Sequence, residues 1–232
     1  MDKIEVKILD HNLDKNFVTF LAMLTQRGSE ITCMKDLTDL YDKVKSKPPK
    51  EQLVQLPHTT IQRMNYVTIA ITGLSTKALT QFRTHAKRST CISTSTQYSS
   101  FENRADNYVI PNGIDSVDKN MMRAAYNDIQ RAYTALIKAG ANKDAIGYLL
   151  PQGLRKAFIM TANISDWNYI LQTRLCHRNT LEVQYICKLI YNEIARIDKV
   201  WLTQAKPYCY YGKCPEGTFS CGKVFTEKEL EL

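Results

Sequence analysis

Long apolar runs are absent from this sequence. Nowhere do about 18 apolar residues follow one another, the length that a membrane-spanning helix requires. Residues 1–10 alternate polar and apolar side chains, as a strand does, and lack the apolar core of a secretory signal. No internal repeat is found. We therefore expect a cytoplasmic protein that does not associate with membranes.

Cysteine pairs of the Cys-x2-Cys type are also absent, although the chain contains 7 cysteines. In a reducing compartment such cysteines are thiols or metal ligands rather than disulfides. Cys209, Cys214 and Cys221 lie in a segment that contains Gly and Pro, and Cys176 or His177 could complete a tetrahedral zinc site. Two alternatives stay open: a structural zinc site, or reduced thiols in a packed tail.

The composition is that of a globular protein with an excess of positive charge. The length of 232 residues suffices for one domain with a full core. Hydrophobic residues make up 44% of the chain and charged residues 23%, as in ordinary globular proteins. The net charge of +8 favours anionic partners: nucleotides, folates with glutamate tails, nucleic acid or an anionic membrane face. Charge alone does not choose among these partners.

Hydrophobic periodicity predicts an order of strands and helices that is typical of an α/β or α+β domain. Alternating patterns predict strands at residues 4–9, 65–74 and 155–163. Amphipathic patterns and capping residues predict helices at residues 14–26, 37–45, 76–82, 116–139, 142–150, 166–176 and 181–204, with Ser75 and Ser165 as two of the N-caps. We expect a central mixed sheet flanked by long helices in residues 1–205, followed by a Cys-containing tail, residues 206–232.

The segment from Gln81 to Ser100 is unusually rich in cations and hydroxyl groups. Arg, His and Lys side chains come first, and a dense run of Ser and Thr follows. Guanidinium groups bind phosphate through two parallel hydrogen bonds, and short hydroxyl side chains satisfy the remaining oxygens. The segment therefore suits a phosphate-rich ligand, although composition alone favours a polar surface loop.

This segment resembles the signature of flavin-dependent thymidylate synthases, in which an Arg-His-Arg cluster leads into a Ser-rich stretch. Further matches follow in order: L-V-Q-L-P-H ending at His58, the stretch from Leu149 to Asn163, and S-D-W-N-Y-I-L-Q-T-R ending at Arg174. The tail, Y-C-Y-Y-G-K-C-P-E-G, is similar to the ending of a subset of this family. Several ordered matches are more specific than any single motif.

The resemblance implies a fold and a reaction. A methyltransferase of this family transfers the methylene group of methylenetetrahydrofolate to C5 of dUMP, which yields dTMP for nucleotide biosynthesis. FAD, reduced by NADPH, supplies the hydride, and the protein places the rings and tunes their charge. The resemblance also implies a homotetramer with its sites at the subunit interfaces.

The resemblance also implies which residues form the site. Arg174 takes the catalytic place, where a permanent cation contacts the uracil and favours ionisation of its N3 position. The residues expected to bind FAD are His58, Thr60, Arg83, His85, Lys87, Arg88, Asn163 and Ser165. The residues expected to bind the pyrimidine nucleotide are Gln81, Ser93, Ser95, Thr96, Gln97 and Arg174.

Several family arginines are replaced in this chain. The Arg that grips the nucleotide phosphate is Gln97, the Arg before the Leu-Pro turn is Gly147, and the Arg after the flavin-contacting Asn is Ser165. The family's Ala-Gln pair is Asn179-Thr180. Each lost charge-assisted bond costs ~1.5–3 kcal/mol of binding. Activity then requires compensation from other cations, for which the candidates are Arg83, Lys87, Arg88, Arg155 and Arg178.

Three other functions compete with thymidylate synthesis. The first is modification at C5 of another pyrimidine nucleotide, such as UMP or dCMP, which the altered phosphate residues would fit. The second is a non-catalytic homologue that binds flavin or nucleotide. The third is RNA binding through stacking on Tyr208, Tyr210 and Tyr211, but no standard RNA-binding motif is present, so nucleic acid is the least favoured partner.

Overall fold

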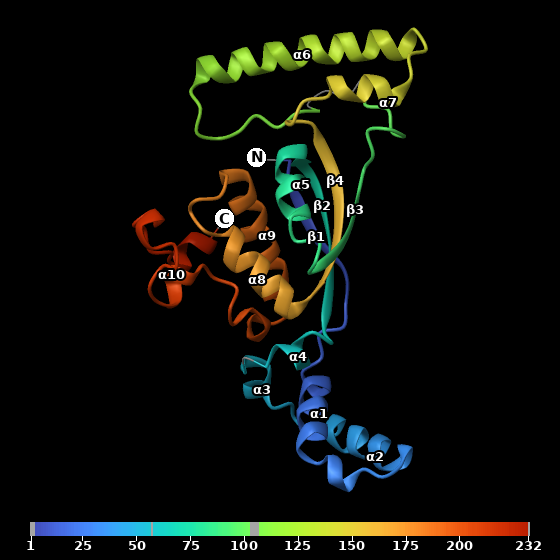
Figure 1. Ribbon diagram of the computed structural model, residues 1–232, viewed down its shortest axis with the longest axis vertical. Helices are drawn as coiled ribbons and strands as arrows, with labels where there is room; N and C mark the ends of the chain where they lie inside the picture. Colours follow the sequence, from blue (N-terminus) through green and yellow to red (C-terminus); the bar gives the residue numbers. More distant parts are fainter. Residues whose placement is uncertain (1–2, 57, 103–106, 232) are drawn as a thin grey trace.

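A four-stranded sheet runs through the middle of the molecule (Figure 1). The computed structural model describes residues 3–56, 58–102 and 107–231. The strand order is β1-β2-β4-β3, and all three strand pairs are antiparallel, so the expectation of a mixed sheet was wrong in this respect. The strands are β1 (Glu5–His11), β2 (Tyr66–Ser75), β3 (Ser89–Ser93) and β4 (Arg155–Asn163).

The predicted strands are confirmed, and one further strand was missed. β4 has the predicted bounds. Every second residue is buried along β4 and along β2 up to Ile71, including Val67 and Ile69 on β2 and Phe158 and Met160 on β4. The missed strand is β3, whose sequence S-T-C-I-S is mostly polar because it lies at the edge of the sheet. An edge strand needs no apolar face to be held by its neighbour.

Two helical groups extend the molecule beyond the sheet at opposite ends (Figure 1). One group holds α1 (Lys15–Gln26), α2 (Met34–Lys45), α3 (Glu51–Gln55) and α4 (Thr59–Gln62). The other holds α6 (Ser116–Lys138) and α7 (Lys143–Ile146). The predictions of helices at 14–26, 37–45 and 116–139 are confirmed, although α2 begins earlier because Cys33 and Asp36 form a capping box.

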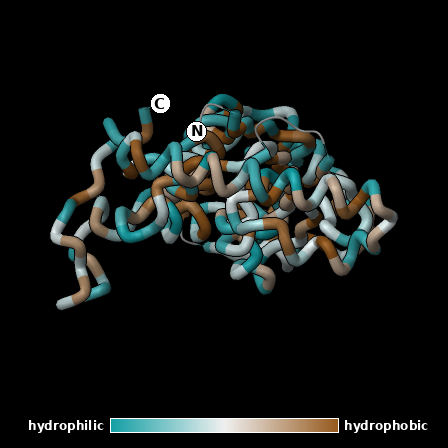
Figure 2. Tube along the Cα trace, turned by 90° about the horizontal axis from the view of Figure 1, so that it is seen from above, coloured by the Kyte–Doolittle hydropathy of each residue, from teal (hydrophilic) through white to brown (hydrophobic). Residues whose placement is uncertain are grey.

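Helix α6 leaves most of its apolar stripe uncovered. Tyr133 is its one buried residue within the described chain, whereas Val117 and Met121 are well exposed. No helix among the described residues is long and apolar enough to cross a membrane. Figure 2 agrees with this, since hydrophobic residues alternate with hydrophilic ones along the chain and form no long continuous segment.

One face of the sheet is covered by α8 (Ile164–Arg174) and α9 (Leu181–Ile197), and α5 (Thr76–Arg83), which follows β2, lies on the same side (Figure 1). Ser75 caps α5 as predicted, accepting a hydrogen bond from the Ala78 amide at 3.0 Å. The predicted cap Ser165 is wrong: Asn163 caps α8, and its Oδ1 accepts from the Asp166 amide at 2.9 Å. An Asn at the end of a strand is already extended, so it can start the helix two residues earlier.

The last long helix is shorter than its apolar pattern predicts. α9 ends at Ile197 instead of residue 204, because Asp198 adopts an extended conformation, with φ −169° and ψ 129°. The Asp198 carboxylate then accepts from the Val200 amide at 3.0 Å and starts a separate 3₁₀ turn, Lys199–Leu202. The apolar residues of this turn, Val200 to Leu202, are still buried, which is why the pattern continues past the helix end.

The C-terminal tail packs against the body of the protein. It contains α10 (Tyr208–Tyr211) and the 3₁₀ turns Gly217–Phe219 and Glu227–Leu230, and its Phe225 and Leu230 side chains join the main core. The Glu229 carboxylate lies 2.5 Å from His177 Nε2. Partial burial opposes the change, but hydrogen bonds from His177 and the Thr226 amide lower the pKa of Glu229 below its usual value. The division into a domain and a tail stays a prediction.

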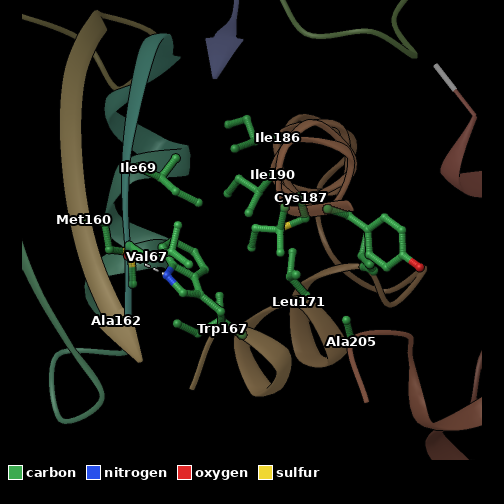
Figure 3. Close-up of a cluster of buried hydrophobic side chains, with 14 of the residues drawn as sticks. Val67, Ile69, Met160, Ala162, Trp167, Leu171, Ile186, Cys187, Ile190 and Ala205 are labelled. Atoms are coloured by element: carbon green, nitrogen blue, oxygen red, sulfur yellow. Dashed lines mark hydrogen bonds between the residues drawn. The ribbon is translucent and has the colours of Figure 1, made fainter. Parts of the chain in front are cut away.

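Trp167 joins the sheet to the helical layer. Its side chain is fully buried between α8, β2 and α9, and its indole Nε1 donates to the Val67 carbonyl at 2.9 Å (Figure 3). Ile186 and Ile190 of α9 line the same cluster. The indole therefore fills the centre of the core and also satisfies a backbone acceptor of β2.

Replacing Trp167 with Phe should lower the free energy of unfolding by about 1–3 kcal/mol, because the Val67 carbonyl loses its indole donor and a void is left. Urea denaturation monitored by circular dichroism measures the change. Tyr148→Phe is the matched control, since Tyr148 is 91% exposed, and it should change stability by less than about 0.5 kcal/mol. Equal stability of the two variants would contradict this account of the core.

Candidate functional site

A buried carboxylate organises the start of α8. Asp166, which is 6% exposed, accepts from Arg88 Nη1 at 2.9 Å and from Asn163 Nδ2 at 2.6 Å. Arg88 comes from the connection between α5 and β3, and Asn163 comes from the end of β4. This one carboxylate therefore joins the basic segment to the β4–α8 junction, 78 positions away in the sequence.

Two aromatic rings, Tyr169 and His85, connect the Asp166–Arg88 pair to Arg174. The Arg88 guanidinium lies 4.1 Å from the centroid of the Tyr169 ring, close enough for a cation–π interaction. The Tyr169 and His85 rings are nearly perpendicular, with 6.0 Å between their centroids. Tyr169 lies on α8 and remains 37% exposed. Sequence reasoning missed both Asp166 and Tyr169, although they follow Asn163 by one helical turn and two.

His85 accepts a hydrogen bond from Arg174. The two atoms, Arg174 Nε and His85 Nε2, are 2.9 Å apart, which assigns the imidazole proton to Nδ1. Burial, with the charges of Arg174 and Arg88, lowers the pKa of His85 to about 4. His85 is therefore a neutral acceptor at physiological pH and adds no positive charge.

The Arg174 guanidinium is fixed by the protein on several sides. Besides His85, its Nη2 donates to the Gln81 carbonyl at 3.0 Å and to Thr84 Oγ1 at 2.6 Å, and its Nη1 donates to Asn179 Oδ1 at 3.1 Å. Burial lowers its pKa, yet an arginine stays charged at any physiological pH. One of the five N–H groups, the second on Nη1, has no bond among these contacts.

A second group of cations lies beside the end of β3. Arg83 Nη2 donates to Ser93 Oγ at 2.6 Å, and Lys156 Nζ donates to the Thr94 carbonyl at 3.3 Å. Sequence reasoning missed Lys156. The signal was available, since Lys156 has the same phase in β4 as Phe158 and Met160, the buried positions.

The remaining predicted residues lie outside the cluster. His58 and Thr60 are exposed on or beside α4, and within the described chain no hydrogen bond joins them to Asn163 or Arg174. Lys87 and Gln97 are exposed, and Ser165 lies in the first turn of α8. The hydroxyl of Ser95 accepts a hydrogen bond from the Gln97 amide at 3.1 Å. Thr96 lies beside Gly147, since a Cβ added to Gly147 would be 3.4 Å from the Thr96 carbonyl oxygen.

The predicted zinc site is not formed. Across the described ranges no group of three or more His, Cys, Asp or Glu side chains is placed to hold a metal ion, so Cys209, Cys214 and Cys221 are corrected to separate free thiols. Cys209 Sγ instead accepts from the Phe225 amide at 3.4 Å. His177, the alternative ligand, is engaged by Glu229.

Comparison with known families decides the identity of the fold. Residues 7–198 match the family described as thymidylate synthase complementing protein. The chain belongs to the family of flavin-dependent thymidylate synthases. The synthase of Geobacter sulfurreducens is 24% identical over 236 residues, covering 98% of this chain and 97% of its own. That of Pyrococcus abyssi is 24% identical over 215 residues, covering 84% and 86%.

Two solved structures share the fold. Thymidylate synthase X of Helicobacter pylori, solved with FAD and dUMP, matches with a TM-score of 0.65 at 15% identity, over 87% of this chain and 97% of its own. The UMP/dUMP methylase PolB of Streptomyces cacaoi, bound with 5-Br dUMP, matches with a TM-score of 0.64 at 15% identity, over 87% and 94%. The predicted α/β fold class is thereby confirmed.

The His85 ring should remain neutral from pH 8 down to about pH 5. In imidazole NMR titrations of the wild type, we expect a midpoint near 4 rather than near the usual 6.5. Because the unfolded chain binds a proton at 6.5 and the folded chain does not, this group should lower stability as the pH falls from 6.5 towards 4. His85→Gln should remove that part of the acid sensitivity, and a wild-type midpoint near 6.5 would contradict the buried Arg174 contact.

Proposed function

We propose that the protein is a flavin-dependent thymidylate synthase that converts dUMP to dTMP, with methylenetetrahydrofolate as carbon donor and NADPH-reduced FAD as hydride source. One observation carries the proposal. Asn163, Arg88, His85 and Arg174, which the family resemblance selects, are joined in one continuous cluster through Asp166 and Tyr169. Residues that the sequence motifs had grouped together are thus neighbours in space.

The residues around Asp166 fit a large, planar and anionic cofactor. The Arg88 side chain is 40% exposed, Lys87 is exposed next to it, and the Tyr169 ring is partly exposed. The ion pair with Asp166 holds the Arg88 guanidinium in place, so it needs little reorganisation to bind a phosphate group. A bound flavin would supply the hydride. The residues that we assign to it are His58, Thr60, Arg83, His85, Lys87, Arg88, Asn163 and Ser165.

Arg174 is proposed as the catalytic residue. Neutral His85, Thr84 and Asn179 hold its guanidinium without cancelling its charge, because none of the three is an anion. A fixed cation of this kind stabilises negative charge that develops on a uracil ring. The substrate residues assigned with it are Gln81, Ser93, Ser95, Thr96 and Gln97.

The exposed apolar face of α6 supports assembly of the chain into the homotetramer that the family resemblance implies. A helix of 23 residues with one buried residue would be costly to leave in water. Covering it with another subunit would place segments of a second chain beside the sheet ends, where sites shared between subunits are expected.

A second candidate is methylation of another pyrimidine nucleotide. The likeness to the UMP/dUMP methylase PolB favours it, as do the replaced arginines at Gln97, Gly147 and Ser165. A non-catalytic flavin-binding homologue is the third candidate, and RNA binding is the last.

The deciding experiment combines a flavin spectrum with turnover. The purified protein should bind FAD and turn yellow, elute as a tetramer in light scattering, and form dTMP from dUMP when supplied with methylenetetrahydrofolate and NADPH. UMP and dCMP are tested in parallel. Product from UMP alone would favour the second candidate, and a colourless monomer after FAD addition would contradict the proposal.

Arg174→Ala should lower dUMP turnover by about 100- to 1000-fold, because a preorganised electrostatic partner is removed from the reacting ring. FAD binding should stay close to that of the wild type, which absorbance titration measures. Arg27→Ala, at an exposed arginine after α1, serves as control and should keep full turnover. If Arg174→Ala keeps near-normal turnover in an active enzyme, the pyrimidine lies elsewhere.

A further inference from the structure

Two cations are anchored on consecutive residues at the end of β3. Arg83 reaches Ser93 with one guanidinium nitrogen, at 2.6 Å, and Lys156 reaches the Thr94 carbonyl with its ammonium, at 3.3 Å. Arg83 comes from the last turn of α5, and Lys156 comes from β4. Two separate elements therefore bring positive charge to the same short segment.

Lys156 is unusually buried for a lysine. The residue is 7% exposed, and its ammonium lies 4.7 Å from the centroid of the Phe101 ring. Burial, and then the charge of Arg83, lowers the pKa of Lys156 to about 8. Burying a cation beside another cation is costly unless an opposite charge compensates it.

No carboxylate in the described part of the chain compensates these two charges. The hydrogen-bond partners of the pair are uncharged, namely the Ser93 hydroxyl and the Thr94 carbonyl, and the Lys156 ammonium also lies over the Phe101 ring. Each of the two side chains keeps N–H groups beyond these bonds, because a guanidinium has five and an ammonium three. The pair therefore has both the charge and the donors to bind an anion.

The surrounding segment also lacks the cation that the family resemblance predicts. Gln97 stands three residues after Thr94, where the family has the Arg that grips the nucleotide phosphate. The intervening residues, Ser95 and Thr96, carry hydroxyl groups. The buried Lys156 of β4 thus contacts the segment from which the expected phosphate-binding arginine is absent.

We propose that Arg83 and Lys156 form the subsite for the phosphate monoester of the pyrimidine nucleotide, in place of the arginine missing at Gln97. Exposed Arg83 contacts the phosphate directly, and buried Lys156 supplies a second positive charge from the protein interior. The inference rests on the proposed function and deepens it, since it assigns Arg83 to the substrate rather than to FAD.

Calorimetric titration of the full-length protein with dUMP, deoxyuridine, inorganic phosphate and FAD tests the subsite. Lys156→Met and Arg83→Gln should each weaken dUMP binding by about 10- to 100-fold at pH 7, the usual effect of losing a charge-assisted hydrogen bond. Deoxyuridine, which lacks the phosphate, should bind both variants and the wild type equally. Lys138→Met, at an exposed lysine ending α6, should leave every affinity unchanged.

The pH dependence separates charge from packing. Wild-type affinity for dUMP should fall above about pH 8, as Lys156 loses its proton. The groups that face this ammonium are Arg83, Thr94 and Phe101, and Arg83 is the charged one among them. Lys156→Arg should bind dUMP at pH 7 and abolish the fall, because arginine keeps its charge. The pH dependence of deoxyuridine binding is the control, because deoxyuridine has the same base as dUMP and lacks the phosphate.

Several results would overturn the subsite. One is that wild type does not bind dUMP, and another is that both variants bind dUMP within twofold of wild type. A loss of FAD affinity instead of dUMP affinity would assign the pair to the cofactor's diphosphate. Arg83→Gln changes an exposed side chain, so it answers the question even if Lys156→Met fails to fold. If dUMP binding depends on both cations but no dTMP forms, the subsite stands and the proposed function fails.

Discussion

The buried carboxylate of Asp166 is the constraint on which the candidate site depends. It holds Asn163 at the end of β4 and Arg88 from the α5–β3 connection, and it lies in the first turn of α8. A buried carboxylate must be paired to be tolerated, so its two partners are fixed as firmly as the carboxylate itself. The strand end, the basic segment and the helix that carries Arg174 are thereby placed relative to one another.

From this corner the charge pattern changes along α8. Near Asp166 the cation Arg88 is paired with a carboxylate, whereas near Arg174 the partners are uncharged: His85, Thr84, Asn179 and a backbone carbonyl. His85 stays neutral because it is buried beside two arginines. One end of the site thus orients a cation, and the other end preserves a positive charge. That division suits a ligand with separate anionic and reacting parts.

Elements with strong local patterns could be predicted from the sequence. β4 has its predicted bounds because Phe158, Met160 and Ala162 alternate clearly, and α6 is recognised although its stripe is mostly uncovered. β3 was missed because an edge strand needs no apolar face. The antiparallel order of the sheet depends on which strands pair, and no local sequence pattern contains that information. Ser165 lost its predicted capping role to Asn163, since either side chain satisfies the same local rule.

The sequence by itself determined the family, the fold class and the residues that carry the charges, because these follow from ordered motifs and from periodicity. Only the tertiary structure decided which charges meet. It joined Arg174 to His85 across 89 positions in the sequence, separated the tail cysteines, and revealed Lys156 beside Arg83. The physical reason is that pairing, burial and pKa depend on distances in space between strands and helices, whereas a motif records only their order along the chain.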